Sequence, residues 1–225
     1  MDLTILVFLL GGLFLGWSLG ANDAANVFGT AVGTRMIRFK TAAMVCGVFV
    51  ILGAVISGAG TTATLGRLGS INAMPGAFAA CVAAGLAVYV MTKSGLPVST
   101  TQAIVGAIVG WNIYTGSSTN IQVLITIILT WVLCPIIAGL IAMLFFILTK
   151  KLLQITSLHL LRLDAYTRLA LLLAGAFGAY SLGANNIANV MGVFVPISPF
   201  TEINFMNILT LSSTGQLFLL GGIAI

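Results

Sequence analysis

Five long stretches of apolar residues constrain the fold of this chain more than any other feature of its sequence. They are Leu3–Thr34, Thr41–Ala59, Ala73–Thr92, Val98–Tyr114 and Ile121–Leu148. A helix of about 20 residues spans the hydrocarbon core of a bilayer, and several of these stretches reach that length. Only 6% of the residues are charged, whereas soluble domains carry about 25%. The sequence therefore predicts an all-α polytopic membrane protein with the lipid bilayer as its main solvent.

Charge and side-chain chemistry exclude several classes of function. The first stretch has no basic n-region and no cleavage site of small residues, so we interpret it as a membrane span and not as a signal peptide. The formal net charge of +5 indicates topology, because nucleic-acid binding needs a soluble basic face. The sequence has no paired carboxylates, no nucleophile with a base and no His or Cys metal cluster. It therefore predicts neither an enzyme nor a bound cofactor.

A fifteen-residue motif occurs twice. SLGANDAANVFGTAV covers Ser18–Val32 and SLGANNIANVMGVFV covers Ser181–Val195, with identical residues at ten of fifteen positions. We call these segments the first and second GAN repeats. Gly12, Gly16 and Gly20 form a stripe of small residues that favours helix packing, so a purely structural role is one interpretation. Packing does not need polar side chains, which are costly at membrane depth, and we therefore favour a functional interpretation.

Basic residues predict opposite orientations for the two GAN repeats. Loops rich in lysine and arginine favour the cytoplasm, and such loops follow the first repeat and precede the second. Their basic residues are Arg35, Arg38 and Lys40, and Lys150, Lys151, Arg162 and Arg168. The first repeat then runs inward and the second outward, which predicts inverted-topology repeats with a binding site where they meet. In this scheme Arg67 lies on the outer side.

These orientations divide the chain into three parts. Residues 1–150 form the first transmembrane repeat, with a re-entrant helical hairpin at about 73–114. Residues 151–168 form a cytoplasmic connection, and residues 169–225 begin the second, inverted repeat. A last apolar run starts near Ile208 and continues to Ile225. We expect this sequence to be the N-terminal portion of a longer membrane protein, or a half that pairs with another chain.

Each GAN repeat carries three polar side chains in the same arrangement. Positions three and four apart share one face of a helix, so each set makes one polar patch. The two sets are Asn22, Asp23 and Asn26, and Asn185, Asn186 and Asn189. Flanking glycines permit unwinding, which would free backbone carbonyls to bind an ion. Carboxylate, amide and carbonyl oxygens suit hard cations, and Asp23 is the acid that we expect at membrane depth. The patches therefore predict a site for a coupling cation.

The segment SGLPVSTTQAIVG, Ser94–Gly106, predicts the tip of the re-entrant hairpin. Pro97 interrupts the apolar run and favours a break between two helices. Ser99, with Gln102 three residues later, resembles a capping box. A helix N-terminus with free amide and hydroxyl donors binds anions, although ordinary capping in a loop is an alternative. Together with the cation patches, the segment indicates a cation-coupled transporter of a small oxyanion.

Three separate motifs resemble those of the inorganic phosphate transporter (PiT) family. GANDAANVFGTAVGT at Gly20–Thr34 resembles the family pattern GANDxANxxGxxxG, and the second GAN repeat resembles its inverted copy. PVSTTQA at Pro97–Ala103 resembles the hairpin motif. The resemblance implies a secondary active transporter in the plasma membrane that imports inorganic phosphate by alternating access. It implies Na⁺ in preference to H⁺ as the coupling ion, and a homodimer as one assembly.

The resemblance also implies ligands for each ion. Phosphate would contact the hairpin tip and one residue of each GAN repeat. These implied phosphate ligands are Ser99, Thr100, Thr101, Gln102, Asp23 and Asn186. Sodium would be held by the two polar patches. These implied sodium ligands are Asn22, Asp23, Asn26, Asn185, Asn186 and Asn189.

The sequence departs from the family pattern in two places. The second GAN repeat has Asn186 where the family has an acid, which puts the number of coupled cations in question. The sequence also ends before a second PxSTT hairpin.

A symporter of sulfate or another tetrahedral oxyanion is a rival interpretation, since helix-end donors do not distinguish these anions. A protonated phosphate can donate to Asp23 and sulfate cannot, which favours phosphate weakly. An uncoupled channel is a further rival, and so is a packing-driven membrane scaffold.

Overall fold

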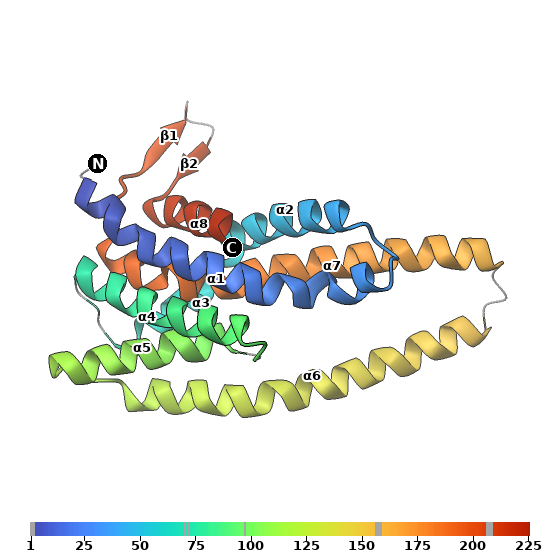
Figure 1. The fold of residues 1–225 in the computed structure, drawn as a ribbon, viewed down its shortest axis with the longest axis horizontal. Helices are drawn as coiled ribbons and strands as arrows, with labels where there is room; N and C mark the ends of the chain where they lie inside the picture. The colour runs from blue at the N-terminus through green and yellow to red at the C-terminus, as the bar shows by residue number, and fades with distance from the viewer. Residues whose placement is uncertain (1–2, 70, 72, 97, 156–158, 206–208) are drawn as a thin grey trace.

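The computed structural model describes residues 3–69, 71, 73–96, 98–155, 159–205 and 209–225, and its elements are drawn in Figure 1. Their order is α1 (Leu3–Gly33), α2 (Phe39–Ser57), α3 (Ala59–Gly66), α4 (Met74–Lys93), α5 (Thr100–Thr115), α6 (Ile121–Ile155), α7 (Leu160–Met191), η1 (Gly192–Ile197), β1 (Ile203–Phe205), β2 (Leu209–Leu211) and α8 (Ser213–Ala224). Among the described residues, α1, α2, α4, α6 and α7 are long and apolar enough to span a membrane. The prediction of an all-α polytopic membrane protein is confirmed.

Helix α7 lies at the centre of the packing and is covered by α1 and α2. Helix α1 runs antiparallel to it, because Gly12 lies against Val190 near one end and Phe28 lies against Gly175 near the other. The two GAN repeats therefore run in opposite directions (Figure 1). The inverted repeat requires such opposite directions, but it stays a prediction, as does the three-part division of the chain.

Gly20, Gly29 and Gly183 of the GAN repeats lie inside continuous helices, whereas at Gly192 the helix α7 gives way to the 3-10 helix η1. Helix α1 is continuous through the first repeat, and α7 is continuous to Met191 in the second. A Cβ atom on Gly20 would collide with the backbone of Ile225, and one on Gly183 would collide with the backbone of Val50. The expectation of unwinding is wrong at Gly20 and Gly183, where glycine instead permits close helix contact.

Helices α4 and α5 form the hairpin that the sequence predicts. Ser99 caps α5 by accepting a hydrogen bond from the Gln102 backbone N–H at 3.3 Å, as the capping-box pattern indicates. Gly116 ends α5 in the left-handed conformation, with φ 69°. Figure 1 shows the α4–α5 turn near the middle of the bundle, far from the end that holds the α1–α2 connection. A hairpin that turns back inside a membrane has this geometry. Pro97 lies outside the described residues.

Helix α6 is the most exposed element of the fold. Only Val123, Leu124, Ile127 and Trp131 pack against the main core, and every residue of α6 from Val132 onward is exposed. The apolar character of this surface is that of a lipid-facing helix. Pro135 lies inside α6 without ending it.

Two sequence-based boundaries differ from the structure. The range 151–168, expected to be a connection, is helical to Ile155 and again from Leu160. The start of the last apolar run, expected near Ile208, lies outside the described residues; Leu209–Leu211 form β2, which pairs antiparallel with β1, and α8 starts at Ser213. Hydropathy does not mark the helix ends at Ile155 and Leu160, because helices extend beyond their apolar cores. Arg168 on α7 donates to the Met36 carbonyl oxygen at 2.7 Å, which joins α7 to the α1–α2 connection.

Candidate functional site

The polar patch of the first GAN repeat contacts the hairpin tip through Asn22. The Asn22 side-chain amide donates to the Val98 carbonyl oxygen at 3.0 Å and to Asp23 Oδ1 at 2.7 Å. Its carbonyl oxygen accepts a bond from the Thr92 hydroxyl at 3.2 Å. Thr92 lies in the last turn of α4 and Val98 just before α5, so Asn22 bridges both arms of the hairpin. This network fixes one oxygen of Asp23 beside the turn.

The second GAN repeat contacts the same tip through Asn189. Its amide nitrogen donates to the Thr101 hydroxyl oxygen at 2.9 Å and to Asn186 Oδ1 at 2.8 Å. Asn186 and Asn189 are both buried, with 7% and 3% of their surface exposed. Because Thr101 uses a lone pair to accept this bond, its own proton remains available to a ligand. The turn of the hairpin therefore joins the two repeats.

The hairpin tip holds one buried hydroxyl without a partner. Thr100 is 2% exposed, and its Oγ1 atom makes no hydrogen bond with the described residues. It lies between Ser99, the cap of α5, and Thr101, the partner of Asn189. An unpaired buried hydroxyl costs about 1–3 kcal/mol. A ligand that accepted a bond from Thr100 would recover this free energy.

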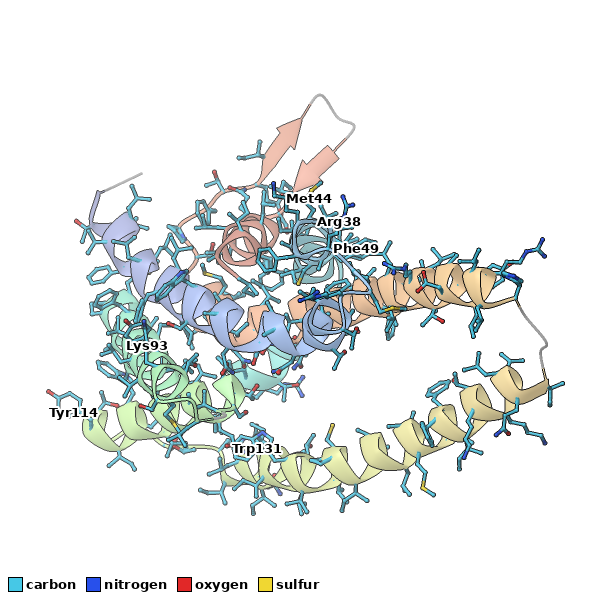
Figure 2. The ribbon with its side chains drawn as sticks, turned by 45° about the vertical axis from the view of Figure 1, so that its right-hand side comes forward. Arg38, Met44, Phe49, Lys93, Tyr114 and Trp131 are labelled. Atoms are coloured by element: carbon cyan, nitrogen blue, oxygen red, sulfur yellow. The ribbon has the colours of Figure 1, made fainter. Side chains whose placement is uncertain are left out.

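A cavity of about 200 Å³ opens beside the contact between Asn189 and Thr101. Its polar lining comes from four elements: Thr61 and Thr64 of α3, Thr101 of α5, Thr130 of α6, and Asn185 and Asn189 of α7. Trp131 of α6 covers one side of it, and Figure 2 labels this residue on the part of α6 that lies below α5. The polar lining residues are all uncharged. We call this cavity the α7 groove.

The structure brings together only part of each predicted polar patch. Asn22 and Asp23 are partly buried and joined by a hydrogen bond, whereas Asn26 is exposed. Asn186 and Asn189 are buried and bonded to each other, whereas Asn185 is exposed and lines the α7 groove. Sharing a helix face does not ensure a shared site, because neighbouring elements cover only part of that face.

Asp23 is isolated from the other acids of the described chain. Asp164 lies near the start of α7, where it pairs with Arg168 at 2.8 Å, and Glu202 lies just before β1. Lys93, labelled in Figure 2, lies exposed at the end of α4. Its Nζ lies 5.8 Å from the centre of the Tyr89 ring. In the part of the chain that is described, no ion pair joins Asp23 to a basic residue.

Sequence reasoning missed the hydroxyls of α3 and α6. Thr61 donates to the Ala184 carbonyl oxygen at 3.0 Å and so connects α3 to the second GAN repeat. Thr64 and Thr130 line the α7 groove with it. The signal was present in the spacing, because Thr61 and Thr64 are three residues apart, and such residues share a helix face. Hydropathy does not mark these threonines, because they lie within or directly after long apolar stretches.

Replacing Asn189 with alanine is expected to destabilise the protein by about 1–3 kcal/mol, because the buried oxygen of Asn186 then loses its donor. The bond to Thr101 is lost as well. Thermal unfolding in detergent measures the change as a lower Tm. Asn185→Ala is the matched control: its side chain is exposed, and its Tm should stay close to that of the unaltered protein. Equal Tm values for the two variants would contradict this prediction.

Known proteins share these sequence and structural features. The sequence profile described as "Phosphate transporter family" matches residues 19–163. A protein of Pyrococcus furiosus named "Putative phosphate permease" is 38% identical over 165 residues, which cover 68% of this chain and 40% of that protein. One of the same name from Thermococcus kodakarensis is 39% identical over 166 residues, with 68% and 41% covered. The chain thus spans about 40% of the length of these curated relatives.

A solved structure has the same fold. It is described as "The sodium-dependent phosphate transporter", and it aligns with a TM-score of 0.72 at 25% sequence identity. The alignment covers 99% of this chain and 74% of that one. The profile match includes the first GAN repeat, the hairpin and α6, which hold most of the site described above. The chain belongs to the phosphate transporter family.

Proposed function

We propose that this chain provides one part of a secondary active transporter that imports inorganic phosphate together with Na⁺. The observation that carries the proposal is the shared contact of both GAN repeats with one hairpin tip, through Asn22 and Asn189. Alternating access requires a site whose walls belong to elements that move relative to each other. A hairpin bonded at its turn to two antiparallel helices supplies walls from separate elements, which supports the proposal. Transport leaves the substrate chemically unchanged, so the protein is not an enzyme.

Phosphate binds, in this proposal, at the hairpin tip and in the adjacent α7 groove. The free proton of Thr101 and the unpaired hydroxyl of Thr100 supply donors for its oxygens. Ser99 and Gln102 complete the first turn of α5, where the helix dipole favours an anion. Asp23 and Asn186 remain proposed ligands, with Asp23 accepting a hydrogen bond from the protonated anion.

Sodium binds beside the same tip. Asp23 is the proposed charged ligand, with the amide oxygens of Asn22 and Asn26 from its own helix. Asn185, Asn186 and Asn189 provide the neutral oxygens of the second repeat. Amide and carboxylate oxygens match a hard cation, and the name of the structural neighbour specifies sodium dependence. A cation bound here also offsets the charge of phosphate in a groove whose polar lining is uncharged.

Sulfate is the second candidate substrate, because it has the same tetrahedral shape. The presence of Asp23 favours phosphate, since an ionised carboxylate accepts a hydrogen bond from HPO₄²⁻ or H₂PO₄⁻ and repels a fully deprotonated anion. We accordingly expect excess sulfate to inhibit phosphate uptake weakly. We propose the plasma membrane as the site of import and a homodimer as one assembly.

Uptake of labelled phosphate into proteoliposomes tests the function. The protein is reconstituted and given an inward Na⁺ gradient, an inward H⁺ gradient, or neither. We expect accumulation above equilibrium with the Na⁺ gradient alone. Accumulation with H⁺ alone would replace the coupling ion and retain the substrate. Equilibration without accumulation would indicate a channel, and labelled sulfate accumulating in place of phosphate would identify the other oxyanion as the substrate.

A further inference from the structure

A second polar cavity lies between α3 and α6. It has a volume of about 530 Å³, and its polar lining consists of Thr64, Arg67, Gln122 and Thr126. The GAN repeats and the hairpin contribute nothing to it. Thr64 lines both this cavity and the α7 groove, so the two spaces are adjacent. We call the cavity between α3 and α6 the Arg67 cavity.

Two polar helix faces oppose each other along both cavities. Thr61, Thr64 and Arg67 follow each other at intervals of three residues through α3 and its C-cap. Gln122, Thr126 and Thr130 follow at intervals of four along α6. Residues at these intervals lie on one side of a helix. These side chains line both cavities from Arg67 to the α7 groove, and we call them together the polar track.

Asn120 holds the two faces together at the Arg67 end. Its backbone N–H donates to the Leu68 carbonyl oxygen at 2.9 Å, just after α3. Its side-chain oxygen accepts a bond from the Val123 N–H at 3.1 Å, which caps the first turn of α6. The start of α6 is therefore fixed beside the end of α3, and Gln122 is kept close to Arg67.

Arg67 is the isolated basic group at its end of the bundle. Seven of the nine lysine and arginine residues lie near the α1–α2 and α6–α7 connections, at the opposite end (Figure 1). The exposed Arg67 side chain has no carboxylate partner among the described residues, whose ion pair is Arg168–Asp164. Its planar fork of N–H donors matches the oxygens of a tetrahedral oxyanion. A lone cation in the lining of a cavity attracts anions from solution.

The hydroxyls along the track differ in what they offer. Thr126 donates to the Gln122 carbonyl oxygen at 2.9 Å and Thr130 donates to the Thr126 carbonyl oxygen at 2.8 Å, so both present lone pairs. The side chains of Thr64 and Gln122 make no hydrogen bond within the described part of the chain, and both contain N–H or O–H donors. A protonated oxyanion, which both accepts and donates, finds partners of each kind.

We propose that Arg67, Gln122 and Thr64 form a capture site for the substrate oxyanion, from which it moves along the polar track to the α7 groove. The inference rests on the proposed transport of phosphate and adds the route of access and the residue that recruits the anion. A capture site acts on the rate of encounter more than on the final affinity. Its effect therefore depends on ionic strength.

Transport kinetics of Arg67→Gln provide the first test. We expect the apparent KM for inorganic phosphate to rise by about 3- to 10-fold at low ionic strength, with the maximal rate unchanged. Raising ionic strength to about 0.15 M with choline chloride, at constant Na⁺, shortens the screening length to about 8 Å and should reduce the difference. Arg67→Lys should recover most of the KM, because the charge remains.

Arg38→Gln is the matched control. Arg38 is also exposed and precedes a helix, but it lies at the start of α2, at the opposite end of the bundle. Its KM should equal that of the unaltered protein. If Arg67 only anchors its loop at the membrane surface, Arg67→Gln would lower stability or yield and leave KM unchanged. That result would overturn the proposal.

Thiol labelling at Thr126 provides a test that does not depend on transport. Thr126→Cys is introduced with the exposed Cys134 replaced by serine; Cys46 and Cys81 are buried. An anionic methanethiosulfonate should label Thr126→Cys faster than a cationic one, and inorganic phosphate should slow the labelling. Adding Arg67→Gln should remove both effects, while labelling of a Thr34→Cys control at the opposite end is unaffected by this change.

The two tests separate failure of the capture site from failure of the proposed function. Preferential, phosphate-sensitive labelling in a protein that does not accumulate phosphate would reject the transport function and retain the anion site. Accumulation of phosphate with equal labelling by both reagents, and with the same KM after Arg67→Gln, would retain the function and reject the capture site.

Discussion

Replacing Asp23 with asparagine is expected to shift Na⁺-driven phosphate uptake to much higher Na⁺ concentrations. In this variant both GAN repeats contain the sequence GANN. The proposed Na⁺ site thus loses its one carboxylate and keeps nearly the same shape. With the Asp23–Na⁺ contact taken as equal to a hydrogen bond to a charged group, about 1.5–3 kcal/mol, its loss lowers the apparent Na⁺ affinity by about 10- to 100-fold. Initial rates of phosphate uptake, measured over a range of Na⁺ concentrations, will show the shift.

The hydrogen bonds around Asp23 explain why this variant should still fold. Asn22 donates to Asp23 Oδ1 at 2.7 Å, and an asparagine oxygen at the same place accepts that bond equally well. The bond from Asn22 to the Val98 carbonyl oxygen does not involve the charge. The Tm of Asp23→Asn should therefore remain close to that of the unaltered protein, which separates loss of coupling from loss of structure.

Asp164→Asn is the control for removing a carboxylate. Asp164 pairs with Arg168 at 2.8 Å, but about half of each side chain is exposed, 49% and 48%. Exposed ion pairs contribute about 0–1 kcal/mol, so Asp164→Asn should transport phosphate normally. Normal Na⁺-driven accumulation by Asp23→Asn would remove Asp23 from the cation site and leave only neutral ligands for Na⁺.

The sequence predicts the membrane helices well and their ends poorly. Long apolar stretches have few other folds open to them in a bilayer, where every backbone group must bond within its own segment. The α4–α5 hairpin was also predictable, because Ser99 and Gln102 mark the start of α5. The helix ends at Ile155 and Leu160 were not predictable, since the polar residues near them are compatible with either a helix or a connection. The short β1–β2 pair has no comparable signal.

For the candidate site, the sequence identifies the chemistry and leaves the partners undetermined. The GAN repeats and the STT segment were recognised as polar groups at membrane depth. Which of them meet depends on how the helices pack, and spacing alone predicted six patch residues where four are bonded at the site. The bonds from Asn22 to Val98 and from Asn189 to Thr101 cross 76 and 88 residues of sequence. The hydroxyls of α3 went unnoticed because threonine is common in membrane helices for local reasons.

Gly53 and Gly183 lie where α2 and α7 cross, with the two backbones in close contact. A Cβ atom on Gly53 would overlap the Tyr180 carbonyl oxygen, and one on Gly183 would overlap the Val50 carbonyl oxygen. These are backbone atoms, which cannot rotate away as a flexible side chain can. Helices in lipid associate largely through close packing of this kind. Each methyl group therefore has to separate the two helices.

Gly53→Ala and Gly183→Ala are each expected to destabilise the fold by about 3 kcal/mol, at the upper end of the usual cost of overpacking. Thermal unfolding in detergent should show a Tm lower by several degrees, with reduced yield of monodisperse protein. Gly47→Ala is the matched control on the same helix, since a Cβ atom there meets nothing within 4 Å. It should be neutral or slightly stabilising, because alanine favours the helix by about 1 kcal/mol over glycine.

Because Gly183 belongs to the second GAN repeat, its variant also tests the role of that motif. Low stability with near-normal uptake per folded molecule assigns Gly183 to packing, whereas normal stability with lost uptake would contradict the packing role and place this glycine in the transport site.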